Sequence, residues 1–198
     1  MNEERLKEIL RAEADAISRI PVGDSYARAV EMIVEKVHNQ GGKLVASGMG
    51  KAGQIAQNIA TTLCSTGTPA VFLHPAEAQH GDLGVLQPND LMLLVSNSGK
   101  TSLMLELVEL ARKLNPGICL IVITGDTESP LASLADIVLP TGGAPEICPF
   151  GLTPTTSTTV MTVIGDLLVV TVMEAIEFTR AEYAKRHYGG NLGHELKN

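Results

Sequence analysis

Residues 91–102 read Leu-Met-Leu-Leu-Val-Ser-Asn-Ser-Gly-Lys-Thr-Ser, and this stretch decides the fold of the chain. The unbroken apolar run over 91–95 is typical of a strand buried on both faces. Three serines, a threonine and a glycine then lead into a helix predicted over 102–114. Hydroxyl and amide donors at a helix N-terminus can surround a phosphate group. The stretch therefore predicts a buried parallel sheet that binds a phosphorylated small molecule.

Strands and helices alternate on both sides of this stretch. Further elements follow from the apolar spacing: strands over 43–47, 70–73, 118–123 and 137–139, and helices over 52–65 and 155–178. Apolar strands alternating with helices predict an α/β fold with a five-stranded parallel sheet in a three-layer α/β/α arrangement. Ligands of such sheets lie beyond the carboxyl ends of the strands, where the loops gather.

Length and composition favour one domain over 1–198, because 198 residues with 44% hydrophobic content suit a single core. We divide it into N-terminal helices over 1–42, the α/β core over 43–179 and a tail over 180–198. The net charge of −7 argues against a nucleic-acid partner. No signal peptide is visible, and the longest apolar runs fall short of the roughly 20 residues of a membrane span. We expect a cytoplasmic protein with no membrane partner.

The glycine loop Gly48-Met49-Gly50-Lys51-Ala52-Gly53 follows the first strand and matches GxGxxG. A dinucleotide site would place an acidic residue at the end of the next strand, and His74 stands there instead. We therefore expect Gly50 to let backbone approach another ligand. Lys51 is either a solvated first-turn residue or a ligand contact, and a cation at a helix N-terminus is unfavourable unless an anion compensates it.

Four further positions are candidates for chemistry. His80 lies in a loop with His74 and Asp82, but their spacing matches no metal-site template, so we expect no metal. Glu146, between two prolines, is either a solvated loop carboxylate or a general base with a raised pKa. The run 154–159 carries five hydroxyls, of which capping explains one, so Thr158 is a candidate ligand contact. His187 needs the tail to fold over a site, its own or that of a neighbouring subunit.

These segments together resemble the sugar isomerase (SIS) domain family, and within it the D-arabinose-5-phosphate isomerases. The matching segments are 48–53, 65–69, 74–78, 80–84, 96–99, 148–149, 151–152, 154–159 and 189–190. The resemblance implies a flavodoxin-like fold assembled as a homotetramer, with active sites shared between subunits and no cofactor. It implies that D-ribulose 5-phosphate and D-arabinose 5-phosphate are interconverted, which supplies Kdo for lipopolysaccharide or capsule.

The resemblance also assigns residues. Catalytic positions fall on Lys51, His80, Glu146 and His187, and the phosphate contacts fall on Ser96, Asn97, Ser98 and Thr101. We expect an enediol mechanism in which His187 removes the carbon-bound proton and Glu146 orients the sugar or relays a proton. Lys51 or His80 then polarises the carbonyl oxygen and stabilises the enediolate.

The chain departs from the family pattern at several positions. Lys100 and Leu103 stand where the family has glutamates, and Tyr188 replaces a proline. The CBS domains of longer members do not follow, so we expect an isomerase domain that stands alone. Three alternatives stay open: an isomerase of another sugar phosphate, a non-catalytic sugar-phosphate sensor, and a structural oligomerisation unit. Leu103 favours the sensor, whereas the absence of a basic recognition helix disfavours it.

Overall fold

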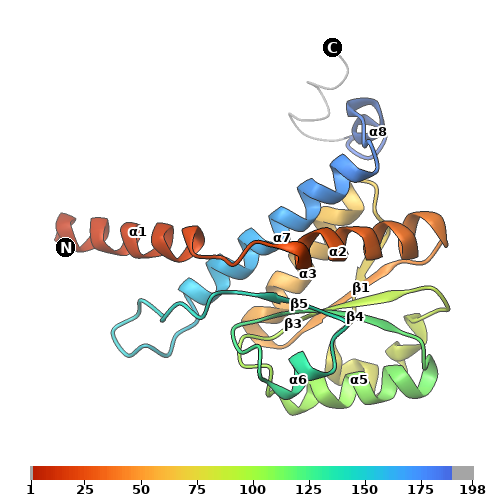
Figure 1. Ribbon diagram of the computed structural model, residues 1–198, viewed down its shortest axis with the longest axis horizontal. Helices are drawn as coiled ribbons and strands as arrows, with labels where there is room; N and C mark the ends of the chain where they lie inside the picture. Colours follow the sequence, from red (N-terminus) through yellow and green to blue (C-terminus); the bar gives the residue numbers. More distant parts are fainter. Residues whose placement is uncertain (1, 189–198) are drawn as a thin grey trace.

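A computed structural model describes residues 2–188 and places one five-stranded sheet at the centre of the fold (Figure 1). The strand order is β2-β1-β3-β4-β5, and every neighbouring pair is parallel. This confirms the predicted fold class. The strands are β1 (Leu44–Gly48), β2 (Ala70–Phe72), β3 (Leu91–Val95), β4 (Cys119–Thr124) and β5 (Ile137–Pro140).

Helices cover both faces of the sheet, as the apolar strands require. Strand residues alternate between two cores: Leu91 and Leu93 of β3 belong to one, and Met92 and Leu94 belong to the other. The first core includes α1 (Glu3–Ser18), α2 (Asp24–Ile33), the π-helical turn η1 (Val34–Asn39), α3 (Gly50–Ser65) and α7 (Thr156–Ala175). The second includes α4 (Pro75–Ala78), the 3-10 turn η2 (Asp82–Val85), α5 (Ser102–Leu114) and α6 (Pro130–Ser133). A short helix, α8 (Arg180–Ala184), follows α7.

The glycines of the first loop set how closely α3 packs on β1. A Cβ atom on Gly53 would lie 2.5 Å from the carbonyl oxygen of Gly48, so only glycine allows this approach. Gly50 has φ of +57°, a left-handed conformation that glycine adopts without strain. The helix begins at Gly50 rather than at Ala52, where the sequence placed it. Lys51 therefore lies in the first turn, at the carboxyl edge of the sheet.

The long helix α7 is apolar on almost all sides. Among residues 2–188 it is the one helix long and apolar enough to cross a membrane, with a mean hydropathy of 1.6 over an 18-residue window. Half of that window is buried inside the protein. The uninterrupted apolar runs are short, as the sequence indicates, but α7 reaches this length because threonine, glycine and serine interrupt the apolar residues without lowering the mean hydropathy enough. Packing against α3 identifies α7 as a core helix of this fold.

Candidate active site

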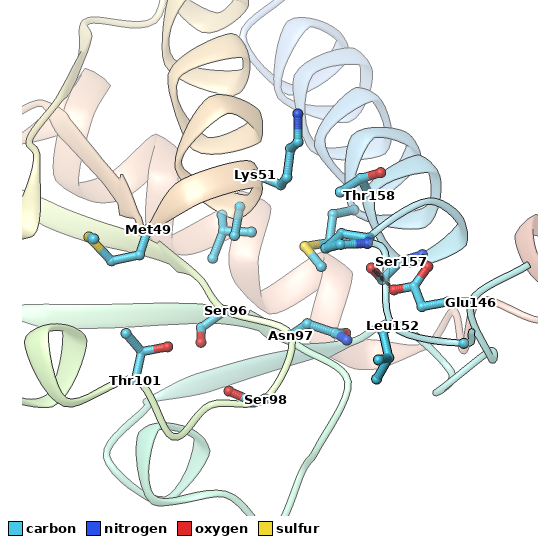
Figure 2. Close-up of a pocket in the computed structure, with 15 residues that line it drawn as sticks. Met49, Lys51, Ser96, Asn97, Ser98, Thr101, Glu146, Leu152, Ser157 and Thr158 are labelled. Carbon is cyan, nitrogen blue, oxygen red and sulfur yellow. Dashed lines mark hydrogen bonds between the residues drawn. The ribbon is translucent and has the colours of Figure 1, made fainter. Parts of the chain in front are cut away.

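A cleft of about 390 Å³ opens at the carboxyl ends of β1 and β3, where the sequence predicted the ligand (Figure 2). Three segments far apart in sequence line it: the glycine loop, the loop after β3, and the loop that leads into α7. Eight of the predicted site residues lie in these segments or in the first turn of the helix that follows: Gly50, Lys51, Ser96, Asn97, Ser98, Thr101, Glu146 and Thr158. All of these except Gly50 line the cleft.

One wall of the cleft consists of two helix N-termini with no side-chain caps. Met49 precedes α3 and Thr101 precedes α5, and neither side chain caps its helix. Neither helix has an acidic residue in its first turn. Uncapped amides and the helix dipole attract an anion. This wall is therefore suited to a phosphate group.

The hydroxyls of the loop after β3 have different tasks. Ser96 is buried at 4% exposure, and its Oγ accepts a hydrogen bond of 3.2 Å from the Gly99 amide, so it shapes the loop. Gly99 has φ of +61°, and a Cβ atom there would lie 2.0 Å from Ser129 Oγ. Ser98 is exposed and lines the cleft, where its hydroxyl can reach a ligand.

The opposite wall carries Glu146, which caps α7 from outside the helix. Glu146 Oε2 accepts hydrogen bonds from the Thr155 amide at 2.7 Å, from Thr155 Oγ1 at 3.0 Å and from the Ser157 amide at 3.3 Å. The Ser157 hydroxyl donates to Oε1. Glu146 thus satisfies donors that the first turn of α7 would otherwise leave unpaired.

These hydrogen bonds set the direction in which the pKa of Glu146 is shifted. Burial raises the pKa of this carboxyl, but the bonds from Ser157 and Thr155 outweigh burial and hold the pKa below its ordinary value. Of the two interpretations that the sequence left open for Glu146, the one with a raised pKa is wrong, because donors that favour the charged form oppose desolvation. Glu146 is therefore ionised at neutral pH, and it faces the cleft as a carboxylate.

Most hydroxyls of the run 154–159 are used within the protein. Thr158 Oγ1 and Thr159 Oγ1 donate to the Thr155 carbonyl at 2.7 and 3.3 Å, and Thr155 and Ser157 serve Glu146. The surplus of hydroxyls therefore does not by itself indicate a ligand. Thr158 does line the cleft, and its oxygen retains acceptor capacity.

Lys51 projects between α3 and α7, across from Thr158 (Figure 2). It is exposed, lines the cleft, and has no ion-pair partner within residues 2–188. No cluster of three or more potential metal ligands occurs in that part of the chain. Its ammonium group is the cation available to a ligand in this cleft.

The two predicted catalytic histidines do not reach this cleft. His80 is exposed in the loop after α4. His187 stacks on Tyr183 with 3.8 Å between ring centroids, and Phe178 lies against Gly67, which precedes β2 at the amino edge of the sheet. Since α7 has 20 residues, about 30 Å of helix separates the two ends. The alternative in which the tail covers its own site is wrong for the described residues. Gly189 and Gly190 lie outside them.

Sequence reasoning missed the apolar lining and one ion pair. Met49, Met161 and Leu152 line the cleft, and apolar spacing alone did not separate them from core residues. Lys100 Nζ lies 2.9 Å from Asp126 Oδ2 and joins the loop after β3 to the loop after β4. Leu103, where the family has a glutamate, is half-buried in the first turn of α5 and does not line the cleft.

Comparison with known proteins identifies the family. The SIS domain profile matches residues 36–171, which include both walls of the cleft. The chain belongs to the SIS domain family. This SIS domain is 44% identical over 186 residues to arabinose 5-phosphate isomerase KdsD of Pseudomonas aeruginosa, covering 93% of the chain and 55% of that protein. It is 42% identical to KdsD of Escherichia coli K12 over 191 residues, covering 96% of the chain and 57% of that protein. The chain thus spans about half the length of the curated relatives it matches.

Solved structures agree with this SIS domain in fold. A putative phosphosugar isomerase involved in capsule formation from Bacteroides fragilis is 65% identical, with a TM-score of 0.93 over 94% of this chain and 97% of that one. The Escherichia coli CFT073 protein c3406, in complex with arabinose 5-phosphate, is 33% identical, with a TM-score of 0.85 over 94% of this chain and 100% of that one. Both are close to this SIS domain in length, so the likeness extends beyond the core sheet.

Proposed function

We propose that this SIS domain is an aldose-ketose isomerase that interconverts D-ribulose 5-phosphate and D-arabinose 5-phosphate, and that it supplies Kdo biosynthesis for lipopolysaccharide or capsule. The observation that carries the proposal is one cleft with an anion-binding wall facing an ionised carboxylate. The names of the curated relatives and of the capsule-related structure support the choice of substrate. No cofactor or metal is needed for this chemistry.

The proposed mechanism passes through an enediol. The uncapped N-termini of α3 and α5, with Ser98 and Thr101, hold the phosphate and fix the sugar. A base takes the proton from the carbon beside the carbonyl and returns it to the neighbouring carbon. Lys51 stabilises the negative oxygen of the enediolate, and Glu146 accepts and returns the hydroxyl proton. Protons and charge balance, because each proton removed is restored.

We propose His187 of a second copy as the carbon base. Within one chain His187 is at the far end of α7 from the cleft, so it can act only across a subunit boundary. The outward side of α7 supports an assembly, since Val170 remains 52% exposed on a helix that is apolar on almost all sides. We therefore propose a homotetramer with shared active sites. His80 is exposed and does not line the cleft of its own chain, and we propose that it too contributes to a neighbour's site.

The remaining features of the proposal concern place and partners. The net charge of −7 disfavours a nucleic-acid partner, and we place the enzyme in the cytoplasm with no membrane partner. A non-catalytic sugar-phosphate sensor is the second candidate, because Leu103 removes an acid that the family uses. An isomerase of a hexulose phosphate or of another sugar phosphate is the third candidate. It would bind the phosphate at the same helix N-termini and differ only in the residues that contact the sugar.

One assay separates these candidates. Arabinose 5-phosphate, ribose 5-phosphate and fructose 6-phosphate are supplied side by side, with a chelator present, and isomerisation of each is followed. Turnover of arabinose 5-phosphate alone supports the proposal. Turnover of another sugar phosphate reassigns the substrate. Tight binding without turnover of any of the three identifies a sensor.

A further inference from the structure

Glu13 of α1 reaches the first turn of α7, 143 residues further along the chain. Thr156 Oγ1 donates a hydrogen bond of 3.0 Å to Glu13 Oε1. Thr156 is 2% exposed and Glu13 is half-buried, so this bond is partly shielded from solvent. The other carboxylate oxygen, Oε2, is also buried and has no hydrogen-bond partner within residues 2–188. A buried polar oxygen in this position calls for an explanation.

The other glutamates of α1 behave differently. Glu3, Glu4 and Glu8 form ion pairs with Lys7, Arg11 and Arg5 on the exposed surface of the same helix. Such exposed pairs contribute little to stability. Glu13 instead bonds across to another element and contacts the helix that carries part of the cleft.

Two carboxylates therefore hold the first turn of α7 from different sides. Glu146 accepts from Thr155 and Ser157 at the cleft, and Glu13 accepts from Thr156 between them. Negative groups at a helix N-terminus are favoured by the helix dipole. Thr155, Thr156 and Ser157 are consecutive, so a change in the backbone at Thr156 would also move the groups that donate to Glu146.

We infer that Glu13 is a positioning residue of this site: it holds the first turn of α7 so that Thr155 and Ser157 stay on Glu146. The effect on turnover rests on the proposed isomerase function, whereas the effect on α7 does not. A displacement of about 1 Å in a supporting residue can reduce turnover by up to about 10²-fold. Because Oε2 has no partner within residues 2–188, the Glu13 carboxylate is held by α1 and by its one bond to Thr156.

Four variants test this inference in the full chain. Glu13→Ala removes both acceptors, Glu13→Gln keeps one acceptor oxygen, and Thr156→Val removes the donor with little change in shape. Glu8→Ala is the matched control, since Glu8 is an exposed acid on the same helix. Amide hydrogen exchange is measured for residues 155–161, the Glu146 carboxyl is titrated by NMR, and kcat and KM are measured for arabinose 5-phosphate.

We expect Glu13→Ala to speed exchange in 155–161, to move the pKa of Glu146 upward and to lower kcat about tenfold with a smaller change in KM. Glu13→Gln restores the exchange, the titration and kcat. Glu8→Ala matches the wild type in every readout. A merely structural role for Glu13 would change stability without moving the Glu146 titration.

The inference is overturned if Glu13→Ala leaves both the exchange of 155–161 and the Glu146 titration at wild-type values. If Glu13→Ala does not fold, Thr156→Val decides: faster exchange and a raised pKa of Glu146 support the inference, and wild-type values overturn it. If the wild type isomerises no sugar phosphate, the proposed function fails. The exchange and titration results still decide the role of Glu13.

Discussion

The two walls of the cleft differ in whether their helix N-termini are already paired with a negative group. The helices α3 and α5 present N-termini that no side chain caps and no first-turn acid neutralises. The N-terminus of α7 is instead occupied by Glu146. Unpaired amides attract an anion, whereas amides that already serve a carboxylate do not. The difference predicts that a phosphate would bind at the N-termini of α3 and α5 and that Glu146 would take part in proton transfer.

The largest expected effect on turnover comes from removing the negative charge of Glu146. Glu146→Gln keeps an oxygen to cap α7 but removes the carboxylate, so kcat should fall by about 10²–10⁴-fold. The affinity for arabinose 5-phosphate, measured by calorimetry, should change little because the other wall is intact. Glu109→Gln on the exposed face of α5 is the control. Unchanged turnover in Glu146→Gln would remove Glu146 from the mechanism.

The separation of His187 from the cleft predicts complementation between subunits. His187→Ala alone should lower kcat about 10²-fold or more. The His187→Ala and Glu146→Gln variants are then unfolded, mixed in equal amounts and refolded together. If each site combines two copies of the chain, roughly a quarter of the sites should contain both His187 and Glu146. Activity of the mixture is compared with that of each variant treated alone. No recovery would mean that the two residues do not meet across a subunit boundary.

Substitutions on the wall formed by the N-termini of α3 and α5 should change KM rather than kcat. Ser98→Ala and Thr101→Val each remove a hydroxyl that can bond a charged group, so KM should rise by about tenfold. The uniform loss of binding leaves kcat close to wild type. Ser102→Ala, at the next position and outside the cleft lining, should change neither parameter. A fall in kcat with unchanged KM would place these hydroxyls in the chemical step.

A smaller effect should appear in the pH dependence. The lowered pKa of Glu146 means that its carboxylate stabilises the fold above its unfolded pKa, and that this contribution is lost as pH falls through the folded pKa. Ser157→Ala removes one donor, so the pKa of Glu146 should rise toward its ordinary value of 4.5. The acid limb of the kcat profile then moves to higher pH. A limb that stays in place would show that another group sets it.

The smallest effect is expected at Lys100, which stands where the family has a glutamate. Its ion pair with Asp126 is exposed, and bonding to Lys100 lowers the pKa of Asp126. Because water screens such pairs, Lys100→Ala should leave the melting temperature and kcat within error of wild type. A clear rise in KM would instead give Lys100 a direct part in phosphate binding.

The outcome for individual residues shows what the sequence could and could not predict. The strand over 91–95 and the helix over 102–114 were predicted to the residue, because an apolar run and helical spacing are local signals. The sequence left a raised pKa of Glu146 open as one of two interpretations, and this one was wrong, because the donors to Glu146 lie nine and eleven residues away at a helix start. The bond between Glu13 and Thr156 left no signal in the sequence: Thr156 lies in the hydroxyl run 154–159, but nothing in that run points to a residue of α1, and Glu13 belongs to no motif.

The sequence by itself determined the parallel sheet, the edge at which the cleft lies, and the hydroxyl loop over 96–101 that suits a phosphate. These follow from strand burial and helix termini, which depend on neighbouring residues. Only the tertiary structure decided that α3 and α5 leave their N-termini open while Glu146 closes that of α7, and that His187 lies at the opposite edge. Hydrogen bonds to the charged form of a carboxyl, and distances along a 20-residue helix, depend on how distant segments pack.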